Sequence, residues 1–227
     1  MTPAASIAIP IPDRVAAGQA LAQRLSAYRR RSDVIVLALP RGGVPVAYQI
    51  ADALEVRLDL MLVRKLGVPG HAELAMGAIA SGGVRVMNPD VLAYARVDQA
   101  SIDAVAAAET TELQRRTRVY RGERQPPLLR EQQVILVDDG VATGATMQAA
   151  VRAVRQQAPA RIIVAVPVAA PESAELLRTQ VDELVCPFMP AMLMAIGQWY
   201  VDFGQTPDQE VIDLLSRAWQ REDVRPC

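Results

Sequence analysis

The sequence predicts an α/β fold with a mostly parallel central sheet flanked by helices. Two stretches, 34–63 and 134–166, each show the order strand, loop, helix, strand, which is the βαβ unit of a parallel sheet. Their strands are unbroken runs of β-branched and aliphatic residues, the pattern of strands buried on both faces. The two stretches therefore fit one sheet, although their sequences do not repeat each other.

The elements of the first half follow from the spacing of apolar residues and from turn residues. Apolar residues at helical spacing predict an amphipathic helix over Asp13–Arg31, with Pro12 and Asp13 as its start. The other expected elements are the strand Val34–Leu39, the loop Pro40-Arg41-Gly42-Gly43, the helix Val44–Leu54, the strand Leu58–Val63, a loop over Leu66–Met76, two short strands within Ala78–Met87 around Ser81-Gly82-Gly83, and a long helix over Gln99–Tyr120.

The second half repeats this alternation and ends in a segment without a clear period. Its expected elements are the strand Val134–Val137, the loop Asp138–Gly144, the helix Ala145–Gln157, the strand Ile162–Val166, a helix over Ser173–Arg178, the strand Glu183–Val185 and a helix over Asp208–Arg221. No element is assigned within Pro187–Pro207, which is rich in Met and aromatic residues.

Composition and charge narrow the class of protein. Of the 227 residues, 51% are apolar, so the chain can bury a proper core, and we expect one domain over 1–227. Its 24 Lys and Arg nearly balance 25 Asp and Glu. The chain therefore has no large net positive charge that would attract nucleic acid or an anionic membrane. Any anion site must therefore be local.

Cysteine use and the N-terminus favour a reduced, cytoplasmic protein. Neither Cys186 nor Cys227 lies in a spacing that holds zinc or an iron–sulfur cluster. Met1–Pro12 lacks the basic and long apolar parts of a signal peptide, and no run approaches the roughly 20 apolar residues that span a bilayer.

The run after the strand Val134–Val137 carries the strongest chemical signal. It comprises Asp138, Asp139, Gly140, Val141, Ala142, Thr143, Gly144, Ala145 and Thr146. Small turn residues at the carboxyl end of a strand, followed by a helix, suit a phosphate. Paired carboxylates instead suit vicinal hydroxyls and Mg²⁺. A ligand with a ribose diol and a 5'-phosphate satisfies both halves, and the alternative is a Rossmann-like turn with two solvated acids.

Cationic side chains and a candidate lid loop lie in the first half of the sequence. Arg41-Gly42-Gly43 offers backbone N–H groups and a guanidinium for an anion, although Pro-Arg-Gly-Gly is also a common tight turn. Arg64 and Lys65 are expected at the end of the second strand, at the same sheet edge. The following loop has the composition of a mobile segment and holds His71, the single histidine, which is either catalytic or simply solvated.

Together these motifs resemble the type I phosphoribosyltransferases, and in particular stand-alone bacterial members whose acceptor is unassigned. The resemblance rests on the acid run, on Pro-Arg-Gly-Gly-Val at 40–44, on Glu-Leu-Ala-Met-Gly-Ala-Ile at 73–79 and on Trp-Tyr-x-Asp-Phe at 199–203, and it spans about 34–203. It implies the type I fold with a core over about 33–186, a small hood from about 1–31, 187–227 or both, and a flexible lid loop over the reacting centre.

The resemblance also implies roles for individual residues. Asp138 and Asp139 would contact the ribose hydroxyls and, indirectly through the sugar diphosphate and water, Mg²⁺. Ala142–Thr146 would surround the 5'-phosphate of 5-phosphoribosyl diphosphate, and Arg41, Gly42 and Gly43 its pyrophosphate. Arg64, Lys65 and His71 are the candidates for stabilising the diphosphate and for the lid. A nitrogen nucleophile would then displace pyrophosphate from C1 of the sugar.

The sequence says less about the acceptor than about the sugar diphosphate. Ala142 stands where the 6-oxopurine enzymes of the family carry an acid, which argues against hypoxanthine or guanine and leaves adenine-, uracil- and orotate-type acceptors open. Trp199 or Phe203 can stack on a flat ring while Asp202 or Gln198 reads its edge, or the aromatic residues simply anchor an irregular segment onto the core.

Two other classes of protein share parts of this pattern. A regulator of the same fold would bind phosphoribosyl diphosphate or a nucleotide without turning it over, and retention of Arg41-Gly42-Gly43 and of Arg64-Lys65 favours an enzyme. A P-loop or dinucleotide-binding protein fails because neither GxxxxGK[ST] nor GxGxxG follows a strand. Relatives of this type are often dimers, so a homodimer is an expectation.

Overall fold

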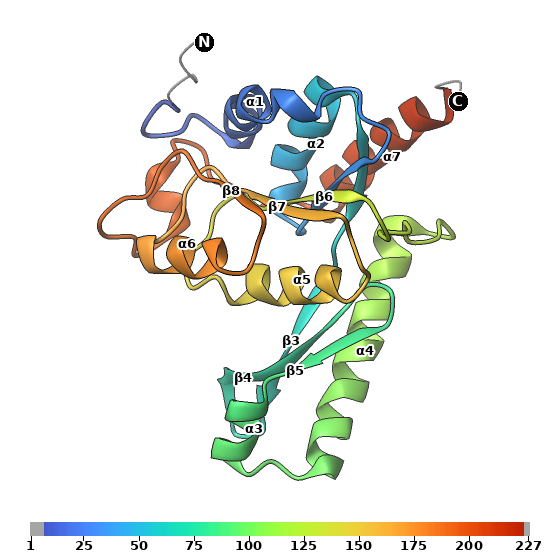
Figure 1. Cartoon of the computed structure of the whole chain (residues 1–227), viewed down its shortest axis with the longest axis vertical. Coiled ribbons are helices and arrows are strands. Elements are labelled where there is room, and N and C mark those ends of the chain that lie inside the picture. The colour runs from blue at the N-terminus through green and yellow to red at the C-terminus, as the bar shows by residue number, and fades with distance from the viewer. Residues whose placement is uncertain (1–6, 225–227) are drawn as a thin grey trace.

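A five-stranded parallel sheet with the strand order β2-β1-β6-β7-β8 forms the centre of the fold. The computed structural model describes residues 7–224, except for the side chains at 72, 73, 223 and 224 (Figure 1). The strands are β1 (Val34–Ala38), β2 (Arg57–Leu60), β6 (Gln133–Val137), β7 (Arg161–Ala165) and β8 (Glu183–Val185). Every residue of β1 and β6 is buried, so the predicted parallel sheet with two covered faces is confirmed.

Alternate residues of the central strands face two helical layers. Val34 and Val36 of β1 pack in one hydrophobic cluster, whereas Ile35 and Leu37 pack in the other, because successive side chains of a strand point to opposite faces. The first cluster lies under α1 (Arg14–Arg24), α2 (Gly43–Leu54) and α7 (Asp208–Val224), and the second lies over α5 (Ala145–Arg155) and α6 (Pro171–Arg178), as Figure 1 shows.

A second, antiparallel sheet with the order β3-β4-β5 projects from the first as a separate lobe. The lobe consists of β3 (Val63–Val68), β4 (His71–Ala80), β5 (Val84–Met87), α3 (Pro89–Ala95) and α4 (Gln99–Arg121), and it lies at the bottom of Figure 1. At the end of α4, the Arg121 guanidinium forms a buried ion pair with Asp59 of β2 (Nη2–Oδ1 2.9 Å). This pair anchors the lobe to the parallel sheet.

The predicted strand Leu58–Val63 is wrong, because the chain changes sheets within it. β2 ends at Leu60, and the Met61 N–H still donates to Ala38 of β1 (2.9 Å). The Leu62 N–H instead donates to the hydroxyl of Ser81 (3.1 Å), and the Ser81 N–H donates to the Leu62 carbonyl (2.9 Å). The apolar run Leu60–Val63 gave no sign of this bend.

The predicted loop over Leu66–Met76 is also wrong, because β3 and β4 pair across it. Val68 lies opposite His71, so only Pro69 and Gly70 form the turn, and Gly70 has φ +78°. Proline followed by a glycine with positive φ fits a type II turn. The composition typical of a mobile loop therefore belongs to an ordered hairpin, irregular near Gly67 where the register shifts.

The remaining expectations differ from the structure mainly at element ends. Glu183–Val185 is confirmed without change, and the helices and the hairpin at Ser81-Gly82-Gly83 are confirmed within a few residues. The N-terminal helix ends at Arg24, not Arg31, and continues as a 3₁₀ turn over Ser26–Tyr28. Helix α3 was not expected, although Asn88 caps it and Pro89 opens it.

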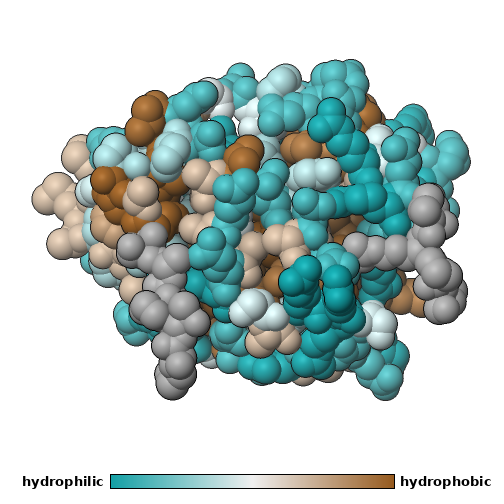
Figure 2. All heavy atoms as spheres, turned by 90° about the horizontal axis from the view of Figure 1, so that it is seen from above, coloured by the Kyte–Doolittle hydropathy of each residue, from teal (hydrophilic) through white to brown (hydrophobic). Residues whose placement is uncertain are grey.

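The face that carries α1, α2 and α7 is largely polar, and apolar side chains gather at the end formed by the 187–204 segment (Figure 2). Met192, Met194 and Val201 of this segment are exposed. Within residues 7–224, no helix combines the length and apolar character that crossing a membrane requires.

Candidate functional site

The loops that follow β1 and β6 meet at the carboxyl edge of the parallel sheet. A Cβ atom on Gly42 would lie 1.9 Å from Oδ2 of Asp139, and one on Gly43 would lie 2.7 Å from the carbonyl oxygen of Val137. Only glycine fits at these two positions, because any side chain would overlap the acid loop. The Pro40–Arg41 peptide bond is cis. The structure thus brings together the two loops that the sequence predicted as one site.

The two acids at the end of β6 are held by different partners. Asp138 accepts a hydrogen bond at Oδ1 from the Asp139 N–H (2.9 Å). Burial raises the pKa of the Asp138 carboxyl well above its usual range, and the neighbouring charge of Asp139 raises it further. Asp139 binds Arg14, whose Nε (2.9 Å) and Nη2 (2.8 Å) both approach Oδ2. The Tyr200 hydroxyl donates to the Asp139 carbonyl (2.7 Å).

The loop between the acids and α5 has the shape expected of a phosphate site. Gly144 precedes the helix with φ +74°, in the left-handed region that favours glycine. The hydroxyl of Ser173, in α6, donates to the Ala142 carbonyl (2.6 Å) and fixes the loop on that side. Thr143 and Thr146 are exposed. The first N–H groups of a helix have no partner within it and favour an anion, so this exposed end of α5 suits phosphate.

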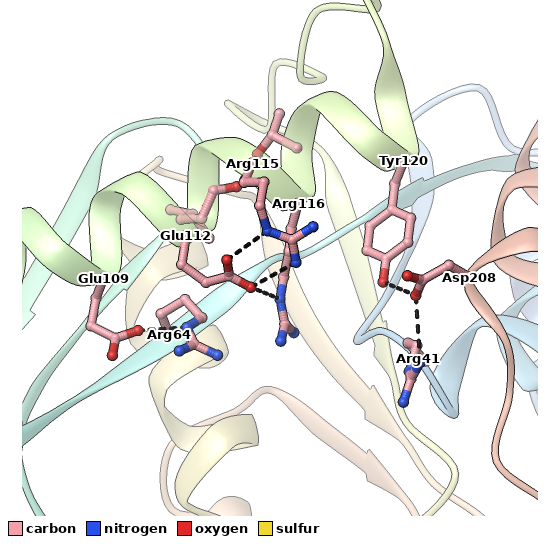
Figure 3. A network of polar contacts seen from close by, with 10 residues as sticks. Arg41, Arg64, Glu109, Glu112, Arg115, Arg116, Tyr120 and Asp208 are labelled. Carbon is pink, nitrogen blue, oxygen red and sulfur yellow. Dashed lines mark hydrogen bonds and ion pairs between the residues drawn. The ribbon is translucent and has the colours of Figure 1, made fainter.

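Arg41, on the opposite loop, is held by a carboxylate from the C-terminal helix (Figure 3). Its Nη1 lies 3.5 Å from Oδ1 of Asp208, the first residue of α7. The Tyr120 hydroxyl, from the end of α4, donates to the same oxygen (2.7 Å). This hydrogen bond and the Arg41 charge lower the pKa of Asp208. Arg41 therefore lies beside the loop glycines, with its side chain 34% exposed.

Arg64 and Lys65 do not lie at the carboxyl edge of the parallel sheet, which corrects the expectation for them. Both belong to β3 in the lobe, because the chain changes sheets at Leu62. Arg64 binds Glu109 of α4 (Nε–Oε2 2.6 Å), as Figure 3 shows. Lys65 and Thr146 instead line one cavity of about 180 Å³ between the lobe and α5. Lys65 therefore lies near the predicted phosphate loop.

His71 lies at the tip of the β3–β4 hairpin. It is exposed, and it lines a cavity together with Tyr94 and Ala95 of α3. Figure 1 shows α3 at the end of the lobe remote from the parallel sheet. The structure does not bring His71 together with the acids.

Both terminal segments contribute to the predicted hood. The Ile11 N–H donates to the Trp199 carbonyl (2.7 Å), and the Val201 N–H donates to the Ile11 carbonyl (2.8 Å). Residues 1–6 of the predicted hood lie outside the described residues, as does Cys227. Ile196, in the 3₁₀ turn Ile196–Trp199, packs so closely on Gly140 that a Cβ there would lie 2.6 Å from its Cγ2.

The three candidate acceptor residues have different surroundings. The Trp199 ring packs edge-on against Phe188, with centroids 5.0 Å apart. The Phe203 ring contacts the Arg14 guanidinium (4.1 Å) and the Tyr200 ring (4.8 Å between centroids). Asp202 is exposed and accepts a hydrogen bond from the Gly204 N–H (3.1 Å). Phe203 alone of the three joins the surroundings of the acid pair through a contact in the structure.

Sequence reasoning missed several residues of the site. Arg14, Ser173 and Asp208 come from distant segments, and no local motif marks them. Tyr200 lies within the Trp-Tyr-x-Asp-Phe run, which was the one available signal for it. No cluster of three or more His, Cys, Asp or Glu side chains that could hold a metal occurs among residues whose side chains are described. Two adjacent carboxylates nevertheless fit Mg²⁺, which usually takes one or two protein carboxylates together with water and substrate phosphates.

Comparisons with known proteins agree on one kind of domain. Residues 10–191 match the model of the phosphoribosyl transferase domain. A Mycobacterium tuberculosis (strain H37Rv) protein provisionally named as a phosphoribosyl transferase is 45% identical over 206 residues, which is 91% of this chain and 46% of that protein. The chain thus spans about half the length of the curated relatives it matches. The crystal structure of TT1426 from Thermus thermophilus is 42% identical, with a TM-score of 0.82 over 90% of this chain and 97% of that one.

Proposed function

The chain belongs to the phosphoribosyl transferase domain family, and from this premise we propose that it is a phosphoribosyltransferase that uses 5-phosphoribosyl diphosphate and Mg²⁺. It transfers the phosphoribosyl group to a nitrogen acceptor and releases pyrophosphate. The acceptor is a nucleobase or a related small molecule.

The observation that carries this proposal is the contact between the two loops at Gly42 and Asp139. It supports the proposal because a helix start that suits a phosphate, an acid pair that suits ribose hydroxyls and an arginine lie along one edge of the sheet. A sugar that carries a phosphate at one end and a diphosphate at the other would meet the helix start, the acid pair and the arginine in that order. We assign the ribose hydroxyls to Asp138 and Asp139, the 5'-phosphate to 142–146 and the diphosphate to 41–43.

The proposed reaction is a displacement at C1 of the sugar. The acceptor nitrogen donates its electron pair to C1, and the bond from C1 to the diphosphate oxygen breaks with its electron pair leaving on pyrophosphate. The proton of the acceptor nitrogen is lost to solvent or to pyrophosphate. Asp138 and Asp139 would hold Mg²⁺ indirectly, through the sugar diphosphate and water, and the metal would neutralise charge on the leaving group. Arg41 adds a guanidinium beside it, and the two loops supply positioning.

The acceptor is proposed to enter on the side of the 187–204 segment. Ala142 leaves no carboxylate there to accept a base proton, so a 6-oxopurine is disfavoured. Trp199, Asp202 and Phe203 remain the candidate contacts. The tight packing of Phe203 on Arg14 and Tyr200 supports an anchoring role for that ring.

Two measurements test the proposal. Calorimetry of wild type with 5-phosphoribosyl diphosphate and Mg²⁺ tests the pocket, and Asp138→Asn and Asp139→Asn are the matched variants. The proposal fails if wild type shows no binding. Release of pyrophosphate across a panel of nucleobases and small amines then tests turnover. Tight binding with no release across that panel would identify a regulator that senses the sugar diphosphate.

A further inference from the structure

Arg14 makes three contacts that join the two ends of the proposed substrate site. Nε and Nη2 bind Oδ2 of Asp139, at 2.9 and 2.8 Å. Nη1 donates to the carbonyl of Gly204 (2.7 Å), and the guanidinium lies 4.1 Å from the centroid of the Phe203 ring. The planar fork of an arginine is therefore fixed by a carboxylate, a carbonyl and an aromatic face at once.

The backbone that carries Arg14 is fixed as well. Arg14 is the first residue of α1, and the Asp13 side chain caps this helix by accepting from the Ala16 N–H (2.7 Å). The Arg14 and Asp139 side chains are only 13% and 14% exposed. A pair shielded to this degree is held more strongly than a surface pair, because water screens it less.

The geometry of the pair leaves part of the carboxylate for a ligand. Both Arg14 nitrogens approach Oδ2, so Arg14 does not use Oδ1. A carboxylate has about four lone-pair positions, and the remaining ones can accept from a hydroxyl. The pair thus holds Asp139 in one orientation without occupying all of its hydrogen-bond acceptor positions.

From these contacts we infer that Arg14 is the positioning residue for recognition of the ribose hydroxyl: it fixes Asp139 for the sugar and ties that acid to Phe203 and Gly204 on the acceptor side. The inference rests on the proposed function of the site. Arg14 itself touches no reacting atom and acts through Asp139. Without Arg14, Asp139 loses its fixed orientation and the sugar loses a preformed partner.

The test separates the sugar from the anion. Binding of ribose 5-phosphate and of inorganic pyrophosphate is measured by calorimetry for wild type, Arg14→Ala, Asp139→Asn and the double variant. Arg14→Ala should weaken ribose 5-phosphate about tenfold or more, since a hydrogen bond to a charged group is worth roughly 1.5–3 kcal/mol. Pyrophosphate, which has no hydroxyl on a sugar, should bind as it does to wild type.

The double variant decides whether Arg14 acts through Asp139. If it does, the double variant should bind ribose 5-phosphate no more weakly than Asp139→Asn alone, because the two effects share one route. Additive losses would overturn the inference, and so would unchanged or tighter binding by Arg14→Ala. Failure of wild type to bind both ribose 5-phosphate and pyrophosphate would overturn the proposed function itself, which is a distinguishable result.

Two further variants keep the test interpretable. Arg14→Gln retains an N–H donor for the Gly204 carbonyl and therefore serves if Arg14→Ala does not fold, with the same loss expected. Arg29→Ala removes an exposed arginine–carboxylate pair, with Glu55 at 2.7 Å, from the same N-terminal region. It should leave both ligands unaffected, and a sugar-specific loss in Arg29→Ala would overturn the inference.

Discussion

The ribose end and the diphosphate end of the candidate site are built in the same way but held with different strength. Each presents a group for the ligand and holds it with an opposite charge: Asp139 with Arg14, and Arg41 with Asp208. The first pair lies at 2.8 Å with side chains 13% and 14% exposed. The second lies at 3.5 Å with side chains 34% and 51% exposed. A short, shielded pair fixes its members, whereas an open pair in water contributes little.

The two ends are also tied to different parts of the fold. Arg14 connects the acids to the terminal segments that form the predicted hood. Asp208 connects Arg41 to Tyr120 at the end of α4, the helix that carries the lobe (Figure 3). From this difference we infer that the proposed ribose subsite is preformed, whereas the proposed diphosphate subsite adapts as its ligand binds and leaves. Ribose 5-phosphate and pyrophosphate probe the two ends separately.

The largest effect is expected from Gly42→Ala, which would break the distinction between the ends. The new methyl group would overlap Oδ2 of Asp139, 1.9 Å from its ideal position, and would push the two loops apart. Overpacking of this kind costs about 1–3 kcal/mol, so binding of both ribose 5-phosphate and pyrophosphate should fall by about 5-fold to roughly 100-fold. Calorimetry with each ligand measures this.

Gly83→Ala is the matched control for Gly42→Ala. Gly83 lies in the β4–β5 turn with φ +75°, where a Cβ would meet nothing within 4 Å. This variant should lose about 1 kcal/mol of stability through backbone strain and keep both affinities. If Gly42→Ala binds both ligands normally, the contact between the loops is not the basis of the site.

The next effect concerns the diphosphate end alone. Arg41→Gln should weaken pyrophosphate roughly tenfold, because a charge-assisted hydrogen bond is lost, and should leave ribose 5-phosphate nearly unchanged. Arg64→Gln provides the comparison, since Arg64 binds Glu109 in the lobe and should matter less. An equal loss in both variants would mean that the lobe contributes to the diphosphate subsite as strongly as the loop does.

Local sequence patterns located some residues of the candidate site and missed others. The acid pair, the glycines and the start of α5 were predictable because each lies at the end of a buried strand, where sequence order fixes position. Arg14 and Asp139 are separated by 125 residues, so no local pattern could reveal their contact. The prediction for Arg64 was wrong for a different reason. The chain bends at Leu62, within the apolar run Leu60–Val63, where the Leu62 N–H donates to the hydroxyl of Ser81 in the β4–β5 turn.

Tyr200→Phe sharpens the ribose side of the comparison with a smaller change. The variant removes the hydroxyl that donates to the Asp139 carbonyl (2.7 Å) and keeps the ring that packs on Phe203. A typical hydrogen bond contributes about 0.5–1.5 kcal/mol, so ribose 5-phosphate should bind about two- to tenfold more weakly. Pyrophosphate affinity is the internal control, and a drop in pyrophosphate affinity of the same size would argue against a preformed ribose end.

The smallest effect on binding is expected from Asp208→Asn, which releases Arg41 from its open pair. Exposed pairs contribute roughly 0.2–1 kcal/mol, so pyrophosphate affinity should change by no more than about fivefold. The effect on stability should depend on pH in a defined direction. Because the pKa of Asp208 is lowered in the folded protein, its charge stabilises the fold above the unfolded pKa of about 3.9 and ceases to do so as pH falls through the lower folded value. Urea unfolding at pH 7, 5 and 3 should therefore show wild type more stable than the variant at pH 7 and 5, with the difference shrinking at pH 3. A difference that stays constant across this range, or a loss of pyrophosphate binding as large as that of Arg41→Gln, would show that the diphosphate end is held as firmly as the ribose end.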